Sequence, residues 1–482
     1  MKKLISLLGG LGLIASTISI TSLAVIGCSR SLPPKIDIRT INSAIEQIIL
    51  TKEEFWTTQE LVEKIGQELD VPNAMNISEE FADTEKKVKK FTFTPTDYSQ
   101  YVGQLSLYQV LNKTTENHTV FLDDLGKAYL IAESAPDKTK EIIHIGWDTE
   151  TRTAHKMPSD LMFAPSYISS NIKSLENLFS GVAEFNDDLA SWDTSQIENM
   201  ASMFNGAVEF NQDLITWNTA NVQDMSNMFN SAIAFNSDIS NWNTGKVTTM
   251  EGMFQSAIAF NSDILTWNTS LVKNMSFMFS QAILFNQNLT TSDNAWNTSL
   301  VEDMNHMFNS AVSFNGDISN WVTSNVTNMS FMFSDSVSFN NDISKWDTSR
   351  VENMESMFKQ ALFFNQDLKS EGNAWNTARV TNMSNMFNSA IKFNGDISSW
   401  NTTNVNNMEG MFNYAILFNK DIASWETQTV MNMNSMFNGA LSFRQNLSNW
   451  EVSQIQNCTD FTNNKNWKQP HQPNFKINEQ GN

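Results

Sequence analysis

Tryptophan returns along this chain at a nearly constant interval, and this regularity limits the folds open to the chain more than any other feature. The interval is 25 residues, except for two steps of 29, and a phenylalanine keeps the same spacing. One such unit cannot bury its own apolar side chains, whereas stacked units cover one another. We therefore expect a repeat solenoid at residues 172–461, with about eleven units and a terminal cap. The tryptophans expected in its core are Trp192, Trp217, Trp242, Trp267, Trp296, Trp321, Trp346, Trp375, Trp400, Trp425 and Trp450.

Each unit contains two different patterns. Its first half places apolar side chains on one face of a helical turn or short helix. The Thr or Ser before it, such as Thr219 or Ser349, is suited to cap that helix. The second half is a short extended stretch that closes in an Asn-Thr or Asp-Thr turn. In one unit the helical residues are Val222, Met225, Met228, Phe229 and Ala232, and the extended ones are Phe235, Ile239 and Trp242.

The shared pattern is Val-x-Asn-Met-x-x-Met-Phe-x-x-Ala-x-x-Phe-Asn-x-Asp-Ile-Ser-x-Trp. It resembles the BspA-like leucine-rich-repeat surface proteins, in the branch common among mycoplasma lipoproteins, and the resemblance covers residues 172 to about 461. The resemblance implies a right-handed solenoid of leucine-rich-repeat type, with a short strand around Asp238–Trp242 and a short helix in each unit. It also implies exposure on the cell surface and suggests adhesion or host contact.

An asparagine and an aspartate follow the second repeat phenylalanine in most units, as Asn236 and Asp238 do. Stacked amide and carboxylate oxygens are hard ligands of the kind calcium prefers. Alternatively, these side chains hydrogen-bond the backbone where each coil turns. We favour this second interpretation, because asparagine replaces the aspartate at Asn288 and Asn446 and the glycine-rich nonapeptide of calcium β-rolls is absent. We expect no metal and no cofactor.

The sequence also predicts no enzymatic activity. Methionine and aromatic residues recur at core positions and are expected to fill each coil. Cys458 lies 25 residues after Met433, so we expect a buried, unreactive thiol there. The five histidines are scattered, and the chain contains no HExxH, GxSxG, CxxC or glycine-rich phosphate loop.

Two features are candidates for a binding surface. The first is a pair of four-residue insertions, and insertions in stacked repeats form loops on one face, often the binding face. The candidate loop residues are Asp293, Asn294, Glu371 and Asn373. The alternative is a neutral bulge that was copied when its unit duplicated. The second feature is a set of positions that vary while the core repeats: Gln223, Lys246, Lys273, Asn325, Arg350, Arg379 and Gln428.

The beginning of the chain resembles a bacterial lipoprotein leader. Two lysines precede an apolar stretch that ends in Gly27-Cys28. We predict a signal peptide at residues 1–27 that is cleaved between Gly27 and Cys28. The resemblance implies lipid attachment to Cys28, palmitate included, and residues 28–40 would then form a tether on the outer face of the cell membrane. The alternative is an uncleaved transmembrane anchor.

The segments that flank the repeats have no periodicity. Residues 41–160 include helical spacing at Thr57–Leu69, which begins with a capping box at Thr57 and Glu60. They also include alternating stretches such as Phe91–Thr94, so a small α+β domain is predicted. Residues 463–482 are polar and are expected to form a flexible tail.

Charge narrows the possible partners. The net charge is −21, which argues against nucleic acid, because phosphate binding requires clustered Lys and Arg. The leading hypothesis is a surface-exposed module that binds a host or extracellular protein through its variable face. The alternatives are a passive, antigenically variable coat and an enzyme accessory with its activity in the N-terminal domain.

Overall fold

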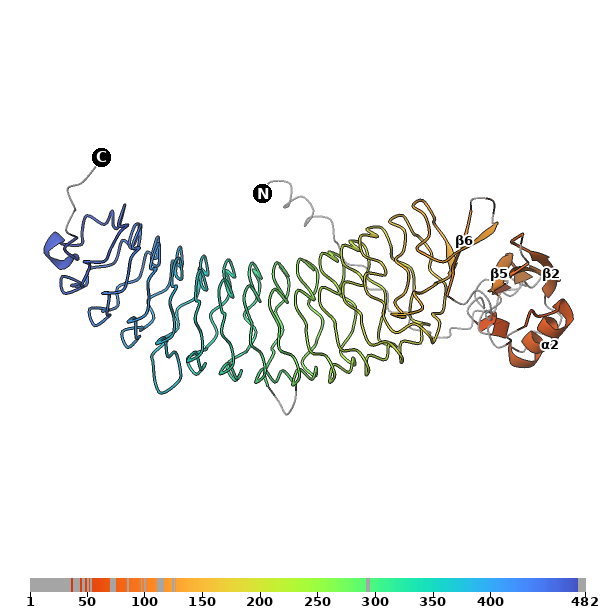
Figure 1. Cartoon of the computed structure of the whole chain (residues 1–482), viewed down its shortest axis with the longest axis horizontal. Helices are drawn as coiled ribbons and strands as arrows, with labels where there is room; N and C mark the ends of the chain where they lie inside the picture. The colour runs from red at the N-terminus through yellow and green to blue at the C-terminus, as the bar shows by residue number, and fades with distance from the viewer. Residues whose placement is uncertain are drawn as a thin grey trace, which may run out of the picture.

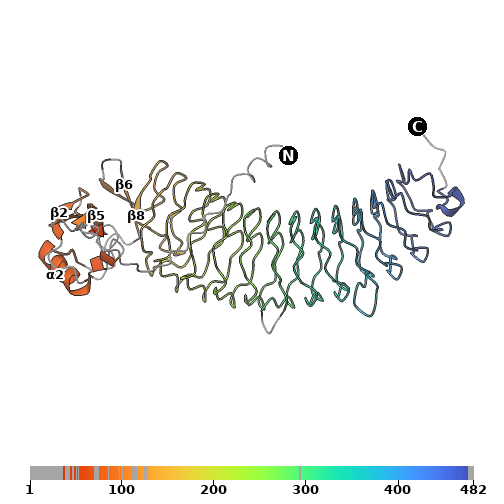
Figure 2. The same cartoon turned by 180° about the vertical axis from the view of Figure 1, so that it is seen from behind.

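A computed structural model describes residues 36–37, 44–45, 48–49, 52, 54–69, 75–84, 86–96, 98, 101–110, 117–123, 125, 127–291 and 295–475. A small folded part with strands and a helix lies at one end of the molecule. A long, gently curved array of stacked coils follows it (Figures 1 and 2). The chain is therefore a repeat protein, as the tryptophan spacing predicted. Among the described residues, no helix is both long and apolar enough to cross a membrane.

The N-terminal part contains the helix α2 (Thr58–Leu69). The capping box predicted for it is present: the Thr57 backbone N–H donates to Glu60 Oε2 at 2.9 Å, and the Glu60 N–H donates to Thr57 Oγ1 at 3.3 Å. The helix buries Leu61 and Ile65. Its apolar face packs into a core that extends to Phe93.

Three small sheets accompany this helix. Strands β2 (Met75–Phe81), β3 (Val88–Pro95) and β5 (Leu105–Val110) form an antiparallel sheet in the order β2-β3-β5. Its centre pairs Ile77 with Phe93 and Phe91 with Leu107. Strand β6 (Thr119–Leu122) lies between β7 (Ala128–Ile131) and β8 (Ile142–His144), also antiparallel. Strands β1 (Ile36–Asp37) and β4 (Tyr101–Val102) pair in parallel. The described part of the chain before the array thus combines a helix with three small sheets.

The border between the two parts differs from the predicted one. One apolar core runs through the whole array, and it already includes Ala135, Ile142 and Trp147. The Ala154 backbone N–H donates to the Ser174 carbonyl at 2.8 Å, which joins an irregular first coil to the repeats. The boundaries drawn at residues 160 and 172 therefore lie too far along the chain. The signal for a coil was missed here because this segment lacks the repeat pattern.

The short helix predicted in each unit does not form within the described repeats. Residues 225–232 instead form successive turns, in which Met228 N–H donates to Met225 O at 3.3 Å and Ala232 N–H to Phe229 O at 3.0 Å. Asn227 and Ser231 have left-handed φ angles of 54° and 59°. A left-handed residue in each turn interrupts a helix, although the apolar side chains still face one side.

These turns release backbone N–H groups for the neighbouring coil. Four alternate residues, Met200, Ser202, Phe204 and Gly206, donate to carbonyls 24 residues later at 2.7–3.0 Å. On this wall of the array, the donors point toward the C-terminal end of the stack at successive steps. Hydrogen bonding between coils therefore fixes the register of the units.

The prediction of a strand at Asp238–Trp242 is also wrong. Trp242 N–H donates to Ile239 O at 3.2 Å and closes a turn at that place. The parallel bridges between coils lie instead at single residues near the start of each unit, as between Asn199 and Asp224. Ile239 and Trp242 both face the core on either side of this turn, and the pattern did not distinguish a turn from a strand.

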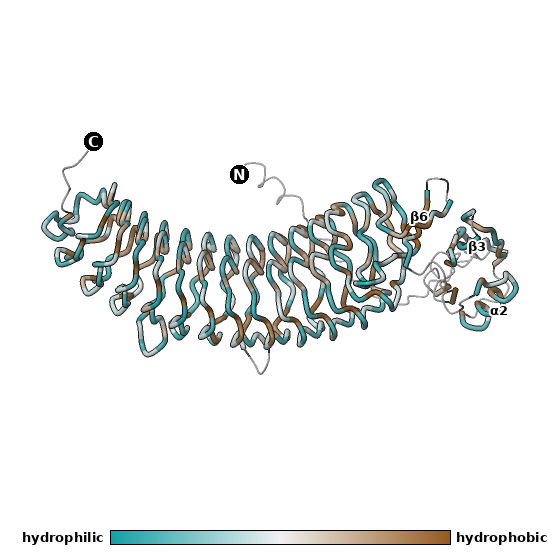
Figure 3. The backbone as a smooth tube through the Cα atoms, viewed as in Figure 1, coloured by the Kyte–Doolittle hydropathy of each residue, from teal (hydrophilic) through white to brown (hydrophobic). Residues whose placement is uncertain are grey.

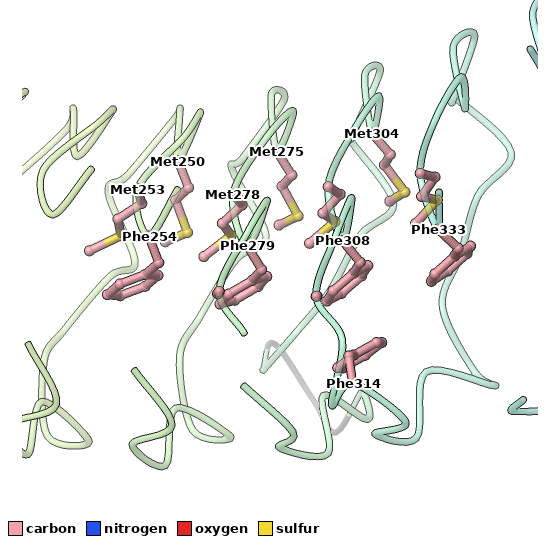
Figure 4. Packing of buried hydrophobic residues seen from close by; sticks show 14 of the residues in the cluster. Met250, Met253, Phe254, Met275, Met278, Phe279, Met304, Phe308, Phe314 and Phe333 are labelled. Atoms are coloured by element: carbon pink, nitrogen blue, oxygen red, sulfur yellow. The ribbon is translucent and has the colours of Figure 1, made fainter. Parts of the chain in front are cut away.

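Aromatic rings stack through the centre of the array. All eleven repeat tryptophans are buried, with at most 4% of their surface exposed. The Trp217 and Trp242 rings stack at 6.4 Å, and Trp242 Nε1 donates to the Leu214 carbonyl at 3.1 Å. Phe229 contacts Phe254 of the next coil at 5.7 Å. Figure 4 shows the same stacking of methionine and phenylalanine side chains around Phe254–Phe333, and Figure 3 shows apolar and polar stretches alternating along the coils.

The C-terminal segment covers the last coil. Trp467 is 2% exposed, and its Nε1 donates to the Gln445 carbonyl at 2.7 Å. Leu447 N–H donates to the His471 carbonyl at 2.7 Å, within the 3₁₀ turn η2 (Gln469–His471). The flexible tail predicted from residue 463 is therefore wrong as far as residue 475, because Trp467 has core to cover. Cys458, expected to be buried, is half-exposed.

Candidate functional site

The repeated asparagines and aspartates form two columns along the array, and their side chains accept hydrogen bonds from the backbone. Asn236 Oδ1 accepts the Asn261 N–H at 2.7 Å, and the same bond repeats from coil to coil. Asp238 Oδ1 accepts the Ser240 N–H at 2.9 Å, and this bond lowers the pKa of the Asp238 carboxyl. These contacts agree with the structural interpretation of the columns. Within the described stretches, no three His, Cys, Asp or Glu residues come close enough to hold a metal ion.

The threonines expected to cap helices have a different role. Thr219 and Thr244 are each 1% exposed. The Thr219 hydroxyl donates to the Asn243 carbonyl of the next coil at 3.0 Å, and the Thr244 hydroxyl donates to the Asn268 carbonyl at 2.8 Å. A buried donor of this kind satisfies a carbonyl that water cannot reach. This column therefore belongs to the scaffold and offers nothing to a ligand.

The variable positions lie on both sides of the buried valine that begins each unit. Six of the seven side chains are exposed and Asn325 is half-buried. Lys246 Nζ donates to Asn221 Oδ1 at 2.7 Å, and an Arg350 guanidinium nitrogen donates to Asn325 Oδ1 at 2.8 Å. Arg350 and Arg379 occupy the same position on consecutive coils. The structure thus brings the variable residues to the surface without giving them a role in the core.

The second insertion forms a loop that projects beyond the lower edge of the array in Figure 1. Glu371 and Asn373 are exposed within it. The loop is held at its base, where Ser370 Oγ donates to the Trp375 carbonyl at 2.6 Å. Lys369 Nζ also lies 3.2 Å from Asp396 Oδ2 of the next coil. The other two candidate loop residues, Asp293 and Asn294, lie outside the described residues, as do Gly27 and Cys28.

A glycine follows each insertion, one coil later. A Cβ atom on Gly316 would lie 1.9 Å from the Gln287 carbonyl oxygen, and one on Gly395 would lie 1.9 Å from the Gln366 oxygen. In the other units this position carries a side chain, such as Ser237. Insertion and glycine therefore form one structural module, which neither residue pattern showed by itself.

Sequence reasoning missed an aromatic strip on the surface. Phe277, His306 and Phe331 occupy the left-handed position of three consecutive coils, where other units carry Asn, Ser or Gly. Their rings stack at 4.5 Å in both steps, with interplanar angles of 11° and 12°. All three side chains are half-buried. The signal was available as a departure from small residues in one repeat position.

A second exposed column consists of aliphatic residues at one position of successive units. Ile233 and Ile258 are each 40% exposed, and Leu441 is 53% exposed. Before the last coil, the carbonyls of this column accept hydrogen bonds from the following coil, as Val208 O does from Ala234 N–H at 3.0 Å. The column is regular along the array, and its side chains lie next to one another.

A polar cavity of about 390 Å³ lies where the N-terminal sheets meet the first coils. Its lining includes Tyr108, Glu141 and Asp187. Burial raises the pKa of both carboxyls, and burial together with nearby carboxylates raises the pKa of Tyr108 to about 12. The cavity can therefore hold a small ligand next to carboxyl groups.

Comparison with known protein families gives a match over the array. The model of a family described as "Mycoplasma protein of unknown function, DUF285" matches four successive stretches, at residues 163–240, 213–295, 291–373 and 369–474. Together they span the array and more than half of the chain. No curated protein and no solved structure matches the chain.

Proposed function

Because the chain belongs to this DUF285 family of mycoplasma repeat proteins, we propose that it is a surface-exposed lipoprotein that acts as an interaction or adhesion module. The observation that supports this proposal is the separation of constant and variable positions. Residues that repeat, such as Trp242 and Thr244, are buried, whereas Lys246, Arg350 and Arg379 are exposed. A surface that changes without disturbing its core suits recognition better than a fixed reaction.

The proposal includes a lipid anchor. Cys28 would carry diacylglycerol and palmitate after cleavage behind Gly27, and the array would extend from the outer face of the cell membrane. Metabolic labelling with an alkyne-bearing palmitate tests this point. We expect the label on the wild-type chain and none on Cys28→Ala. Equal labelling of both chains would contradict the anchor.

We further propose that the array is a solenoid related to the BspA-like leucine-rich repeats. The eleven units, their stacked cores and the parallel bridges between coils support this relationship. The absence of a helix in the described units and the position of the bridges distinguish this array from the unit that the resemblance implied. An experimental structure with units separated into globules would contradict the solenoid.

A capture experiment tests the binding function. The soluble chain 29–482 is immobilised and exposed to host extracellular and serum proteins, and retained proteins are identified by mass spectrometry. A variant with Lys273, Arg350 and Arg379 changed to Ser should retain less of any specific partner. The matched control changes Lys359, Lys392 and Lys420 to Ser, which removes the same charge from other positions of the units.

The outcome separates this proposal from its alternatives. A partner that the control retains and the first variant loses supports recognition through the variable face. Capture of no protein in repeated trials would favour a passive surface coat. The cavity beside Glu141 and Asp187 is the observation that supports an accessory role in handling a small ligand. Saturable binding of a small molecule there, with no captured protein, would favour that alternative.

A further inference from the structure

Two neighbouring columns of side chains run along the array and form an apolar face. The aliphatic column consists of the residue two places before the second phenylalanine of each unit, and ten of the eleven units carry Val, Ile or Leu there: Val208, Ile233, Ile258, Ile283, Val312, Val337, Leu362, Ile391, Ile416 and Leu441. The residue one place before that phenylalanine forms a flanking column, in which Leu284, Phe363 and Leu417 are 47–49% exposed. The flanking column also carries Ala, Ser, Glu and Lys, so the fold tolerates polar residues on this face.

The charges of the apolar face are separated along its length. The aliphatic column carries none, whereas the flanking column has two acidic residues in its first two units and a basic one in the ninth, all exposed: Glu184, Glu209 and Lys392. Lys392 Nζ lies 4.2 Å from the centroid of the Phe363 ring on the preceding coil, a contact that holds the ammonium on the face. A guanidinium nitrogen of Arg444 donates to the Leu441 carbonyl at 2.7 Å, so a second cation lies at the same end. The face therefore begins acidic and ends basic.

The order of residues in the flanking column is complementary to its own reverse. A two-fold axis that crosses the array between the fifth and sixth units would bring two copies face to face, with each column opposite itself in reverse order. Phe363 of one copy would then lie opposite Ala234 of the other, and Leu284 opposite Ser313. Large side chains would thus meet small ones, as a well-packed interface requires.

The same axis pairs opposite charges. Glu209 in the second unit would lie opposite Lys392 in the ninth, and symmetry makes this pair occur twice. An axis along the array would instead gather the glutamates of both copies at one end and their lysines at the other, where like charges repel. Charge complementarity therefore favours the antiparallel order.

The size of the apolar face suits a dimer that dissociates on dilution. Ten coils in register span roughly 50 Å at a coil spacing of about 4.8 Å. A strip roughly 10 Å wide over that length would bury about 1,000 Å² in total from the two copies, which is near the lower limit for a specific interface. The available area is therefore sufficient for a second copy without requiring a permanent dimer.

We propose that the apolar face pairs two copies of this chain side by side in antiparallel orientation. The aliphatic columns form the centre of the interface, and Glu209 and Lys392 form an ion pair at each end of it. The face is complementary to itself in both size and charge, which favours a second copy over an unrelated partner. The pairing goes beyond the binding function and does not depend on it.

Sedimentation equilibrium of the soluble chain 29–482 over a dilution series tests the pairing. The test variant is I258S/L284S, which removes two apolar side chains near the axis, where each is buried in both halves of the dimer. The matched control is L265S/L271S, because these leucines are 38% and 45% exposed at other positions of the unit. We expect a monomer–dimer equilibrium for the wild type and the control, and a dimer at least about tenfold weaker for the test variant.

A charge reversal tests the antiparallel order. Glu209 and Lys392 lie seven coils apart in one chain, so they can meet only between copies. At low salt, E209K and K392E should each weaken the dimer about fivefold, because each places like charges opposite one another. The double variant E209K/K392E should restore the wild-type affinity. The control E302K makes the same change at an exposed position outside the apolar face and should have no such effect.

The outcomes decide between the possible occupants of the face. A wild type that stays monomeric throughout the series would overturn the proposal, as would a dimer that the test variant forms equally well. A double variant as weak as the single ones would overturn the antiparallel order. A monomeric wild type whose capture of a host protein is lost in I258S/L284S would assign the face to that protein instead. A dimer that captures no protein would leave the pairing standing and count against the binding function.

Discussion

At the scale of single residues, Gly316 is the position where the array leaves no room for a side chain. Its Cβ would lie 1.9 Å from the Gln287 carbonyl oxygen, which belongs to the neighbouring backbone and cannot rotate away. Gly316→Ala should lower the free energy of unfolding by about 1–3 kcal/mol, as overpacking does. Urea unfolding followed by tryptophan fluorescence measures the change.

Gly245→Ala is the control for that substitution. A Cβ at Gly245 approaches only the side chains of Asn243 and Asn268, at 3.2 Å, and both can shift. Alanine also occupies this position in another unit, at Ala220. The control should change the unfolding free energy by less than about 0.5 kcal/mol. Equal effects of the two substitutions would show that the close approach at Gly316 is relieved without cost.

His306 gives the array a dependence on pH. Burial lowers its pKa below the ordinary value of 6.5, against a smaller opposing effect of the Asp303 charge. The unfolded chain therefore binds the proton more readily. The stability that the neutral ring contributes is fully present above pH 6.5. It is lost as the pH falls below 6.5 toward the lower, folded-state pKa.

The variant His306→Phe keeps an aromatic ring and removes this titration. Between pH 7.5 and pH 5, the urea midpoint should therefore fall further in the wild type than in the variant. Groups that titrate in both chains, such as His155, cancel in the comparison. If the two chains lost stability equally between these pH values, the His306 ring would not be the source of the effect.

At the scale of elements, each insertion and the glycine that follows it should act as a pair. Deleting residues 370–373 leaves Leu-Lys-Ala-Trp, which has the spacing of an ordinary unit. We expect this deletion to keep the fold and to remove the reason for a glycine at residue 395. Gly395→Ala should then cost about 1–3 kcal/mol in the full chain and much less in the shortened one.

A double-mutant cycle of urea unfolding measures that coupling. The control is the same deletion combined with Gly245→Ala, for which the effects should add because the sites lie in different parts of the array. Additivity in the Gly395 cycle as well would mean that the insertion does not place the Gln366 carbonyl. Such additivity would favour the alternative that the insertion is a neutral bulge.

The sequence predicted some elements of the structure correctly and others wrongly. The period predicted the stacked units, and the capping box at Thr57 and Glu60 located the start of α2. The prediction of a helix in each unit was wrong, because apolar residues at helical spacing also suit successive turns with left-handed residues at Asn227 and Ser231. Nothing in a repeat pattern separates these two backbones, since both present the same face to the core.

The candidate surface was less predictable than the core. Burial of Trp242 follows from its chemistry, so its place in the core could be read from the period. The variable positions reached the surface, but their partner is a property of another molecule. The aromatic strip was not predicted, because Phe277 and Phe331 share the residue type of the core aromatics and differ from them only in repeat position. The cavity beside Glu141 joins segments far apart in the sequence, and no local pattern reports such a meeting.

At the scale of the whole molecule, the two insertions reveal a longer repeat. The two tryptophans that follow them, Trp296 and Trp375, are 79 residues apart, which equals two ordinary units and one insertion-bearing unit. Deleting residues 349–427 removes one such block and joins Thr348 to Gln428 in register. Since each coil contacts only its neighbours, the shortened chain should fold cooperatively, with a smaller denaturant m-value.

The control for that experiment deletes residues 349–439, which also removes the first half of a unit with its buried Val430 and Met433. The shortened coil cannot match its neighbours, and we expect aggregation or a loss of cooperative unfolding. Circular dichroism and urea titration distinguish the outcomes. A cooperative transition in the control chain would contradict the requirement that coils stack in register. An unfolded in-register chain would show that the block cannot be removed without disturbing the rest of the array.

The donors at Met200, Ser202, Phe204 and Gly206 all point in one direction along the stack, and later coils repeat this arrangement. On this wall the two faces of a coil are therefore unlike, since one presents amide hydrogens and the other carbonyl oxygens. Such faces are complementary head to tail, which is the geometry of an open filament. The segment around Trp467 and the irregular coil before Ser174 cover these faces at the two ends of the array.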